Sequence, residues 1–119
     1  MACFAFICRD GGDKTQARRT HLVEHLNYIE SIMDRVLIGG PNPPLRPGDT
    51  RQFEGSLMVY RTETMAEARA LFENDPYFKN GVWDSFEVLN FNPVAGAAVG
   101  GKTWTIVDGQ VRAAAPKPV

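Results

Sequence analysis

The alternation of apolar and polar residues predicts four β-strands in the first 91 residues. Residues 2–8 are almost continuously apolar, which is typical of a strand covered on both faces. Within 54–61, Leu57 and Val59 face one way, while Met58 and Tyr60 face the other. The strands are expected at residues 2–8, 36–40, 54–61 and 85–91.

A helical repeat of apolar residues runs from Thr15 to about Arg35. Four of these residues form a stripe on one face of the helix: Leu22, Leu26, Ile29 and Met33. Such a stripe indicates the side of a helix that faces the core. His25 falls about 60° from Leu22 around the helix axis, on the same side as Arg18. We therefore expect His25 at the edge of the core and not in open water.

A second helix is predicted to begin at Thr64, which has the spacing of a capping box with Glu67. Its apolar stripe comprises Met65, Ala68, Leu71 and Phe72. We expect Pro76 to end this helix, because the residue before a proline avoids helical backbone angles. The same restriction would turn Asp75 out of the helix toward the neighbouring helix that carries His25.

The element order is strand, helix, strand, strand, helix, strand, which predicts the α+β, ferredoxin-like βαββαβ fold. In that fold an antiparallel four-stranded sheet carries both helices on one face. The other face normally meets water, yet residues 2–8 and 57–60 are apolar on both alternations. In a chain of this length the expected cover is the sheet of a second copy. We therefore expect a homodimer.

Two further segments lie outside this pattern. Four prolines between Pro41 and Pro47 predict a loop after the second strand. After Pro93 the composition changes, so we divide the chain into a domain of residues 1–93 and an extension of residues 94–119. The extension is expected to contain a flexible glycine-rich linker, a hairpin turning at Asp108-Gly109, and a disordered tail from residue 114.

Composition narrows the possible partners. The net charge is −1 with acids and bases interspersed, so the chain lacks the basic surface of a nucleic-acid-binding protein. The apolar start is too short to span a bilayer and lacks a positive leader, so we expect a soluble cytoplasmic protein without membrane contact. Cys3 and Cys8 would lie about 16 Å apart on one strand, too far for a disulfide, and are interpreted as small buried apolar residues.

Two short motifs match functional patterns by letter only. GAAVGGKT, residues 96–103, fits a phosphate-binding loop, but strand-forming residues follow it where that loop needs a helix. HLVEH, residues 21–25, fits an inverted zinc-protease signature, but His21 and His25 are the only histidines of the chain. We interpret the first as a linker and expect no metal site at the second.

The combination of His25 with Asp75 has two interpretations. A carboxylate beside a histidine fixes the tautomer of the ring, and the two together form a general acid–base unit. The same pair also occurs as a stabilising contact at the edge of a core, and from the residues alone this structural role is the better supported of the two.

A set of motifs in order along the chain resembles the YciI-like (YCII-related) family over about residues 2–92. The motifs are HLNYI at 25–29, GGP at 39–41, Gly55-Ser56, DPYFKNG at 75–81 and SFEVLNF at 85–91. This resemblance implies a ferredoxin-like fold that dimerises through its sheets into an α+β barrel. It also implies an active site with His25 and Asp75, lined by Ser56. One branch of the family removes chloride from a chlorinated hydroxyquinol.

Taken together, the residues and the family resemblance predict a small enzyme without metal or other cofactor. His25 is expected to act as general base or acid, Asp75 to orient it, Ser56 to hydrogen-bond the substrate, and Arg18 to attract an anionic or phenolate group. The expected ligand is a small aromatic or enolic molecule in an apolar cleft, and the expected reaction an isomerisation or elimination, including dehydrochlorination. The alternative is a non-catalytic, dimeric small-molecule-binding module.

Overall fold

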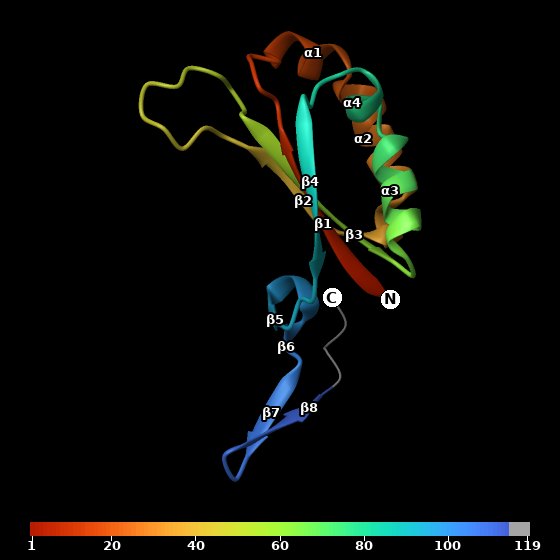
Figure 1. The fold of residues 1–119 in the computed structure, drawn as a ribbon, viewed down its shortest axis with the longest axis vertical. Coiled ribbons are helices and arrows are strands. Elements are labelled where there is room, and N and C mark those ends of the chain that lie inside the picture. The colour runs from red at the N-terminus through yellow and green to blue at the C-terminus, as the bar shows by residue number, and fades with distance from the viewer. Residues whose placement is uncertain (115–119) are drawn as a thin grey trace.

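A computed structural model describes residues 1–114 of the chain. Its centre is one antiparallel sheet with the strand order β2-β3-β1-β4. The strands are β1 (Ala2–Arg9), β2 (Val36–Asn42), β3 (Gly55–Thr62) and β4 (Ser85–Phe91). The helices lie together on one face of this sheet (Figure 1). The predicted α+β class and four-stranded antiparallel sheet are therefore confirmed.

The first helical segment is broken, contrary to the prediction of one helix. It consists of α1 (Thr15–Thr20), α2 (Leu22–Ser31) and a 3₁₀ turn (Met33–Arg35). At His21 the backbone leaves helical angles, with φ −105° and ψ 12°. The His21 N–H still donates to the Ala17 carbonyl, and the His21 carbonyl accepts the His25 N–H, so helical hydrogen bonds continue on both sides of the break.

The second helical segment is also divided. α3 (Met65–Glu73) begins as predicted, with the Thr64 hydroxyl accepting the Glu67 N–H at 3.2 Å. It ends before Pro76, and Pro76 is the first residue of a further short helix, α4 (Pro76–Lys79). A proline at the first helical position loses no hydrogen bond, so it starts a helix here as well as limiting the preceding one. Asp75 lies between the two helices.

The main core fills the space between the sheet and the helices. It is rich in aromatic rings from both layers, including Phe6, Tyr60, Phe72 and Trp83. Phe72 stacks on Phe6 with the ring centroids 4.4 Å apart and on Trp83 at 5.3 Å. These contacts attach α3 to the sheet and to the segment that leads into β4.

Of the predicted stripe on the first helical segment, Ile29 packs against this core, but the other three residues lie outside it. Leu22, Leu26 and Met33 are all exposed, and Leu26 retains 50% of its accessible surface. Of this segment only Ile32 and Arg18 are fully buried. The spacing correctly predicted one shared face, but that face lines a cleft instead of the core.

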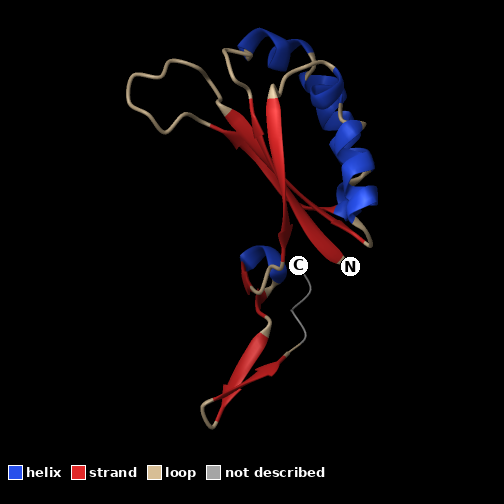
Figure 2. Ribbon diagram, in the orientation of Figure 1, coloured by secondary structure: helices blue, strands red, loops and turns tan. Residues whose placement is uncertain are grey.

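The opposite face of the sheet carries no helix (Figure 2). Cys3, Ala5 and Val59 form a small cluster at its centre with Leu37. Leu57 and Leu89, paired with Ile7 and Ala5 of β1, are exposed beside this cluster. Both cysteines are buried free thiols, as predicted.

The end of β2 and the segment after Pro93 both differ from the prediction. β2 continues through Pro41 to Asn42, which an edge strand tolerates because the proline nitrogen needs no partner there. The stretch expected to be a flexible linker instead forms β5 (Ala95–Gly96), a 3₁₀ turn (Ala97–Val99) and β6 (Gly101–Lys102). Neither difference alters the four-stranded sheet.

The predicted hairpin is present as β7 (Trp104–Val107) and β8 (Gln110–Ala113). Asp108 and Gly109 both have positive φ, at 51° and 73°, as a type I′ turn requires. The predicted tail lies outside the described residues from residue 115 onward. Within residues 1–114, every helix is too short or too polar for a membrane crossing.

Candidate active site

The structure places His25 and Asp75 in contact. The His25 Nδ1 atom lies 2.6 Å from Asp75 Oδ1. His25 occupies the second turn of α2, while Asp75 precedes α4 and accepts the Tyr77 N–H with the same Oδ1 atom at 2.9 Å. The Asp75 side chain is 0% exposed and that of His25 is 13% exposed. The cap of α4 thus fixes the carboxylate that meets the histidine.

The hydrogen bond to Asp75 and a stacked ring hold the His25 imidazole in one orientation. The Tyr77 ring stacks on it with centroids 3.9 Å apart and an interplanar angle of 1°. The Trp83 ring lies nearly perpendicular to it, with the ring centroids 6.4 Å apart and an interplanar angle of 86°. Because an ionised carboxylate only accepts, Nδ1 of His25 carries the proton toward Asp75. Nε2 is then the atom of a neutral ring that can accept a proton from a ligand.

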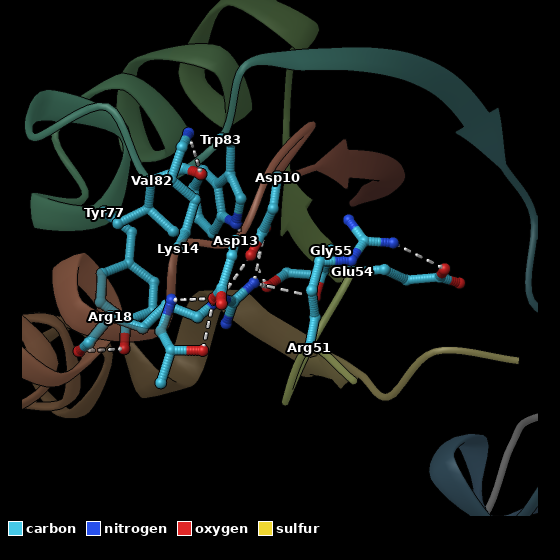
Figure 3. A network of polar contacts seen from close by, with 12 residues as sticks. Asp10, Asp13, Lys14, Arg18, Arg51, Glu54, Gly55, Tyr77, Val82 and Trp83 are labelled. Carbon is cyan, nitrogen blue, oxygen red and sulfur yellow. Dashed lines mark hydrogen bonds and ion pairs between the residues drawn. The ribbon is translucent and has the colours of Figure 1, made fainter. Parts of the chain in front are cut away.

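Arg18 lies in the same cleft but is bound to protein groups. Its Nε and Nη2 atoms donate to the two carboxylate oxygens of Asp10 at 2.7 and 2.9 Å, and Nη2 also donates to the Gly55 carbonyl at 2.9 Å. Asp10 is 0% exposed, so this is a buried bidentate ion pair. Figure 3 shows this network. These bonds occupy Nε and Nη2, so a direct contact of Arg18 with a ligand would have to use Nη1.

The Ser56 hydroxyl joins the Arg18 network to the aromatic wall. It accepts a hydrogen bond from Arg18 Nη2 at 3.1 Å and another from Trp83 Nε1 at 3.2 Å. A hydroxyl oxygen has two lone pairs, and both are occupied here. Ser56 can therefore only donate to a ligand. A carbonyl or anionic oxygen fits that role, whereas a ligand N–H does not.

These side chains border a cleft of about 660 Å³. The exposed stripe of α2 forms one wall, β2 and Met58 form the opposite wall, and Phe53 lies at the end where Arg18 is found. The lining residues include Arg18, His25 and Ser56 but not Asp75, which is held behind His25. The cleft is largely apolar, with polar donors gathered at one end, which suits a small planar molecule carrying acceptor oxygens.

The buried carboxylate influences several groups around it. Burial, with a further contribution from Asp75, raises the pKa of Tyr60 and raises the pKa of the Cys8 thiol to about 12. Among residues 1–114, Tyr60 Oη and Asp75 Oδ2 are the buried side-chain atoms without a hydrogen-bond partner. The site thus keeps a carboxylate in an apolar layer with only one of its two oxygens paired.

Several residues of the site were not foreseen from the sequence. Asp10 belongs to a glycine-rich turn and gave no sign of pairing with Arg18. Tyr77 belongs to the short helix α4 and Trp83 to the segment before β4, and no periodicity indicates that they share a site. A second set of contacts supports this end of the domain: Lys14 Nζ donates to the Gly81 and Val82 carbonyls and pairs with Asp84.

The residues of the two short motifs noted in the sequence can be placed in the structure. His21 contacts Glu24 at 2.6 Å on the exposed surface and is absent from the cleft lining. Within the described part of the chain, no group of three or more His, Cys, Asp or Glu side chains is placed to hold a metal ion. The glycines of 96–101 precede β7 and not a helix.

Comparison with known proteins agrees with this description. The family model of the YCII-related domain matches residues 2–92. Protein YciI of Escherichia coli O6:H1 is 27% identical over 95 residues, covering 76% of this chain and 97% of that protein, and Protein YciI of Shigella flexneri gives the same figures. Among solved structures, 5-chloro-2-hydroxyhydroquinone dehydrochlorinase (TftG) from Burkholderia phenoliruptrix AC1100, in complex with 2,5-dihydroxybenzoquinone, is 26% identical with a TM-score of 0.67. That match covers 80% of this chain and 96% of the other.

Proposed function

The chain belongs to the YCII-related family, and from this premise we propose that it is a small enzyme using His25 and Asp75 for general acid–base chemistry. The observation that carries the proposal is the 2.6 Å contact between His25 Nδ1 and a fully buried Asp75, beside an apolar cleft. A buried carboxylate behind a histidine stabilises the imidazolium that forms when Nε2 accepts a proton. The proposed substrate is a small aromatic or enolic molecule.

The other polar residues of the cleft have complementary roles in this proposal. Ser56 donates its hydroxyl proton to an oxygen of the substrate, and the nearby guanidinium of Arg18 favours that oxygen as a phenolate or enolate. The apolar stripe of α2 contacts the ring of the substrate. The enzyme needs no metal or other cofactor for proton transfer, because His25 both accepts and returns the proton.

The proposed reaction class is isomerisation or elimination. On a chlorinated hydroxyquinol, His25 would move a proton from a ring hydroxyl to the carbon that bears chlorine. Chloride would then leave with the electron pair of the C–Cl bond while a second hydroxyl gives up its proton. The net change is loss of one proton and one chloride ion, and a quinone remains, so no oxidant is consumed. The similarity to the dehydrochlorinase TftG supports this reaction as a candidate.

We also propose a homodimer in which two ferredoxin-like domains join the helix-free faces of their sheets into an α+β barrel. The exposed Leu57, Leu89 and Phe91 on or beside that face support this assembly. Burying their apolar surface in the interface would stabilise the dimer by about 25 cal/mol for each Å² removed from water.

A non-catalytic, dimeric binding module is the second candidate function. One observation favours it: the contacts of His25 with Asp75 and Tyr77 also attach α2 to α4, as a purely structural histidine would. In that case the cleft binds its ligand and releases it unchanged.

Chloride release from 5-chloro-2-hydroxyhydroquinone, measured without oxygen, tests the proposal. We expect His25→Ala to lower kcat/KM by about 10²–10⁴ relative to the wild type. His21→Ala is the matched control, because His21 lies near the same helix junction but outside the cleft, and it should change the rate little. Binding of 2,5-dihydroxybenzoquinone without turnover would support the binding module. Equal rates for wild type and His25→Ala would overturn the catalytic role.

A further inference from the structure

The hairpin β7–β8 has one apolar face and one largely polar face. Residues directly opposite each other in a sheet share a face, and successive pairs alternate between faces. The pairs Trp104–Ala113 and Ile106–Val111 therefore lie on one face, and the pair Thr105–Arg112 on the other. On the apolar face Ile106 is 64% exposed and Val111 is 72% exposed. We call the face of these first two pairs the apolar hairpin face.

The described residues of the same chain leave this face uncovered. Figure 1 shows β7 and β8 standing away from the sheet, beyond the end of β4. The main contacts of each hairpin strand are with the other hairpin strand. A two-stranded hairpin alone is marginally stable in water, so a surface packed against the apolar hairpin face would stabilise it.

The hairpin is nevertheless held at a defined position relative to its neighbours in the chain. The Thr103 N–H and hydroxyl both donate to the Val94 carbonyl, at 3.1 and 3.0 Å. The Ala114 N–H donates to the Thr103 carbonyl at 2.9 Å. These bonds close residues 94–114 into one braced extension that follows directly on β4, so the hairpin can act as an arm.

We propose that this arm packs its apolar hairpin face against a second copy of the chain, beside the helix-free face of that copy's sheet. The strand that leads into the arm carries Leu89 and Phe91, both exposed, and Val94 at the start of the extension is exposed as well. Exposed apolar residues thus recur along the chain from the last strand of the sheet to the apolar hairpin face. This proposal rests on the homodimer proposed above.

The area of the sheet face favours the second copy as the occupant. Four strands spaced about 4.8 Å apart, with about seven residues of 3.4 Å each, present roughly 450 Å² in projection. A stable interface buries about 800 Å² on each partner. A two-fold axis creates two equivalent arm contacts. Each copy takes part in both, because its own arm packs on the partner and the partner's arm packs on it. The two contacts add roughly 260 Å² to each copy and bring the total near the required area.

The comparisons place the arm outside the domain itself. The family model ends at residue 92, and the part of the chain that matches the Escherichia coli protein already covers 97% of that protein. The apolar hairpin face therefore does not belong to the core that these relatives share. A contact between copies explains why an added segment presents isoleucine and valine to the outside.

Replacing two apolar residues of the hairpin by charged ones tests the proposal in the full-length chain. The double variant Ile106→Glu with Val111→Lys keeps a favourable cross-strand pair but removes the apolar surface. Thr105→Glu is the matched control, because it creates the same kind of ion pair with Arg112 on the opposite face. By analytical ultracentrifugation we expect the double variant to raise the dimer dissociation constant at least tenfold and the control to leave it unchanged. An unchanged constant in the double variant, or an equal rise in the control, overturns the proposal.

Two further measurements separate this proposal from the homodimer itself. Leu89→Glu on the sheet should weaken the dimer independently of the arm. If Leu89→Glu weakens the dimer and the hairpin variant does not, the sheet-face dimer stands and the arm proposal fails. If the wild-type chain is monomeric at every concentration, both fail. A photoreactive benzoylphenylalanine at position 106 should cross-link two copies, whereas cross-links confined to one copy or to an unrelated protein contradict the proposal even if the charge variants fold poorly.

Discussion

Replacing Asp75 by Asn or by Ala should separate two effects of this carboxylate. A single oxygen, Oδ1, accepts both the His25 ring N–H and the Tyr77 backbone N–H, while Oδ2 is buried without a partner. An asparagine can keep its oxygen at the Oδ1 position and place its amide nitrogen where Oδ2 lies. Asp75→Asn then removes the charge and keeps both hydrogen bonds, whereas Asp75→Ala removes the acceptor altogether.

The size of each effect follows from this geometry. A hydrogen bond to a charged group contributes about 1.5–3 kcal/mol and a neutral one about 0.5–1.5 kcal/mol. Loss of the charge alone should therefore cost about 1–2 kcal/mol in the transition state, or roughly 5–30-fold in kcat/KM. In Asp75→Ala the His25 ring loses its orientation and the Tyr77 N–H loses its acceptor, so we expect a loss of about 10²–10⁴.

The state of the ring can be read without any substrate. Two-bond ¹⁵N–¹H correlation spectra distinguish a proton on Nδ1 of His25 from one on Nε2. We expect the Nδ1 proton in the wild type and in Asp75→Asn, and a mixed or inverted tautomer in Asp75→Ala. Asp34→Asn, an exposed aspartate after α2, serves as the control that should change neither spectrum nor rate. If Asp75→Asn inverts the tautomer, or costs as much rate as Asp75→Ala, the inference that Oδ1 alone holds the ring is wrong.

Three further predictions concern the fold around the site. Asp10→Asn should lower the free energy of unfolding by about 3–5 kcal/mol, because it leaves the buried Arg18 without its counter-charge; a urea-unfolding difference below 1 kcal/mol would contradict this. Burial raises the pKa of the Cys8 thiol to about 12, so almost all of the thiol is neutral at pH 8. In a Cys3→Ser variant, where Cys8 is the remaining thiol, Ellman's reagent at pH 8 should react with the folded chain at least about 100-fold more slowly than with the denatured chain, and a fast reaction of the folded chain would refute the assignment. Gly55→Ala should cost about 1–3 kcal/mol or more, since its Cβ would overlap the Cys8 carbonyl oxygen, whereas in Gly39→Ala the Cβ meets only the end of a flexible methionine side chain and should cost less; equal melting temperatures of the two variants would count against this reasoning.

The strands were predictable because their side chains alternate at a period that the sheet itself imposes. β4 was predicted with its observed bounds, and β3 was displaced by one residue at each end. The residues of β3 that alternate in the sequence also divide between the two layers, with Met58 and Tyr60 in the main core and Val59 in the small cluster. A strand has little freedom to present another face once one face is buried, so the pattern determines the element.

The polar part of the site was only partly predictable. The pairing of His25 with Asp75 was predicted from the helix end at Pro76 and from family motifs, because the two residues lie 50 positions apart and local spacing does not relate them. The ion pair of Asp10 with Arg18 joins a turn to a helix, and the stacking of Tyr77 on His25 joins two helices. Contacts of this kind depend on how elements are placed in space, which local spacing does not encode. The helix break at His21 is similar, because no glycine or proline marks it.

The apolar stripe of the first helical segment shows a limit of periodic patterns. The spacing predicts which residues share a face, but it does not predict what that face contacts. Leu22, Leu26 and Met33 share one side of the segment, as the spacing predicted, yet they remain exposed along a cleft of about 660 Å³. An apolar face that meets water adds little to the stability of the domain, since the hydrophobic gain requires removal of that surface from water. The same leucines give a planar ligand an apolar wall directly beside the His25 ring. Under the proposed function, the residues that made this helix look like a core element contact the substrate and contribute little to the stability of the fold.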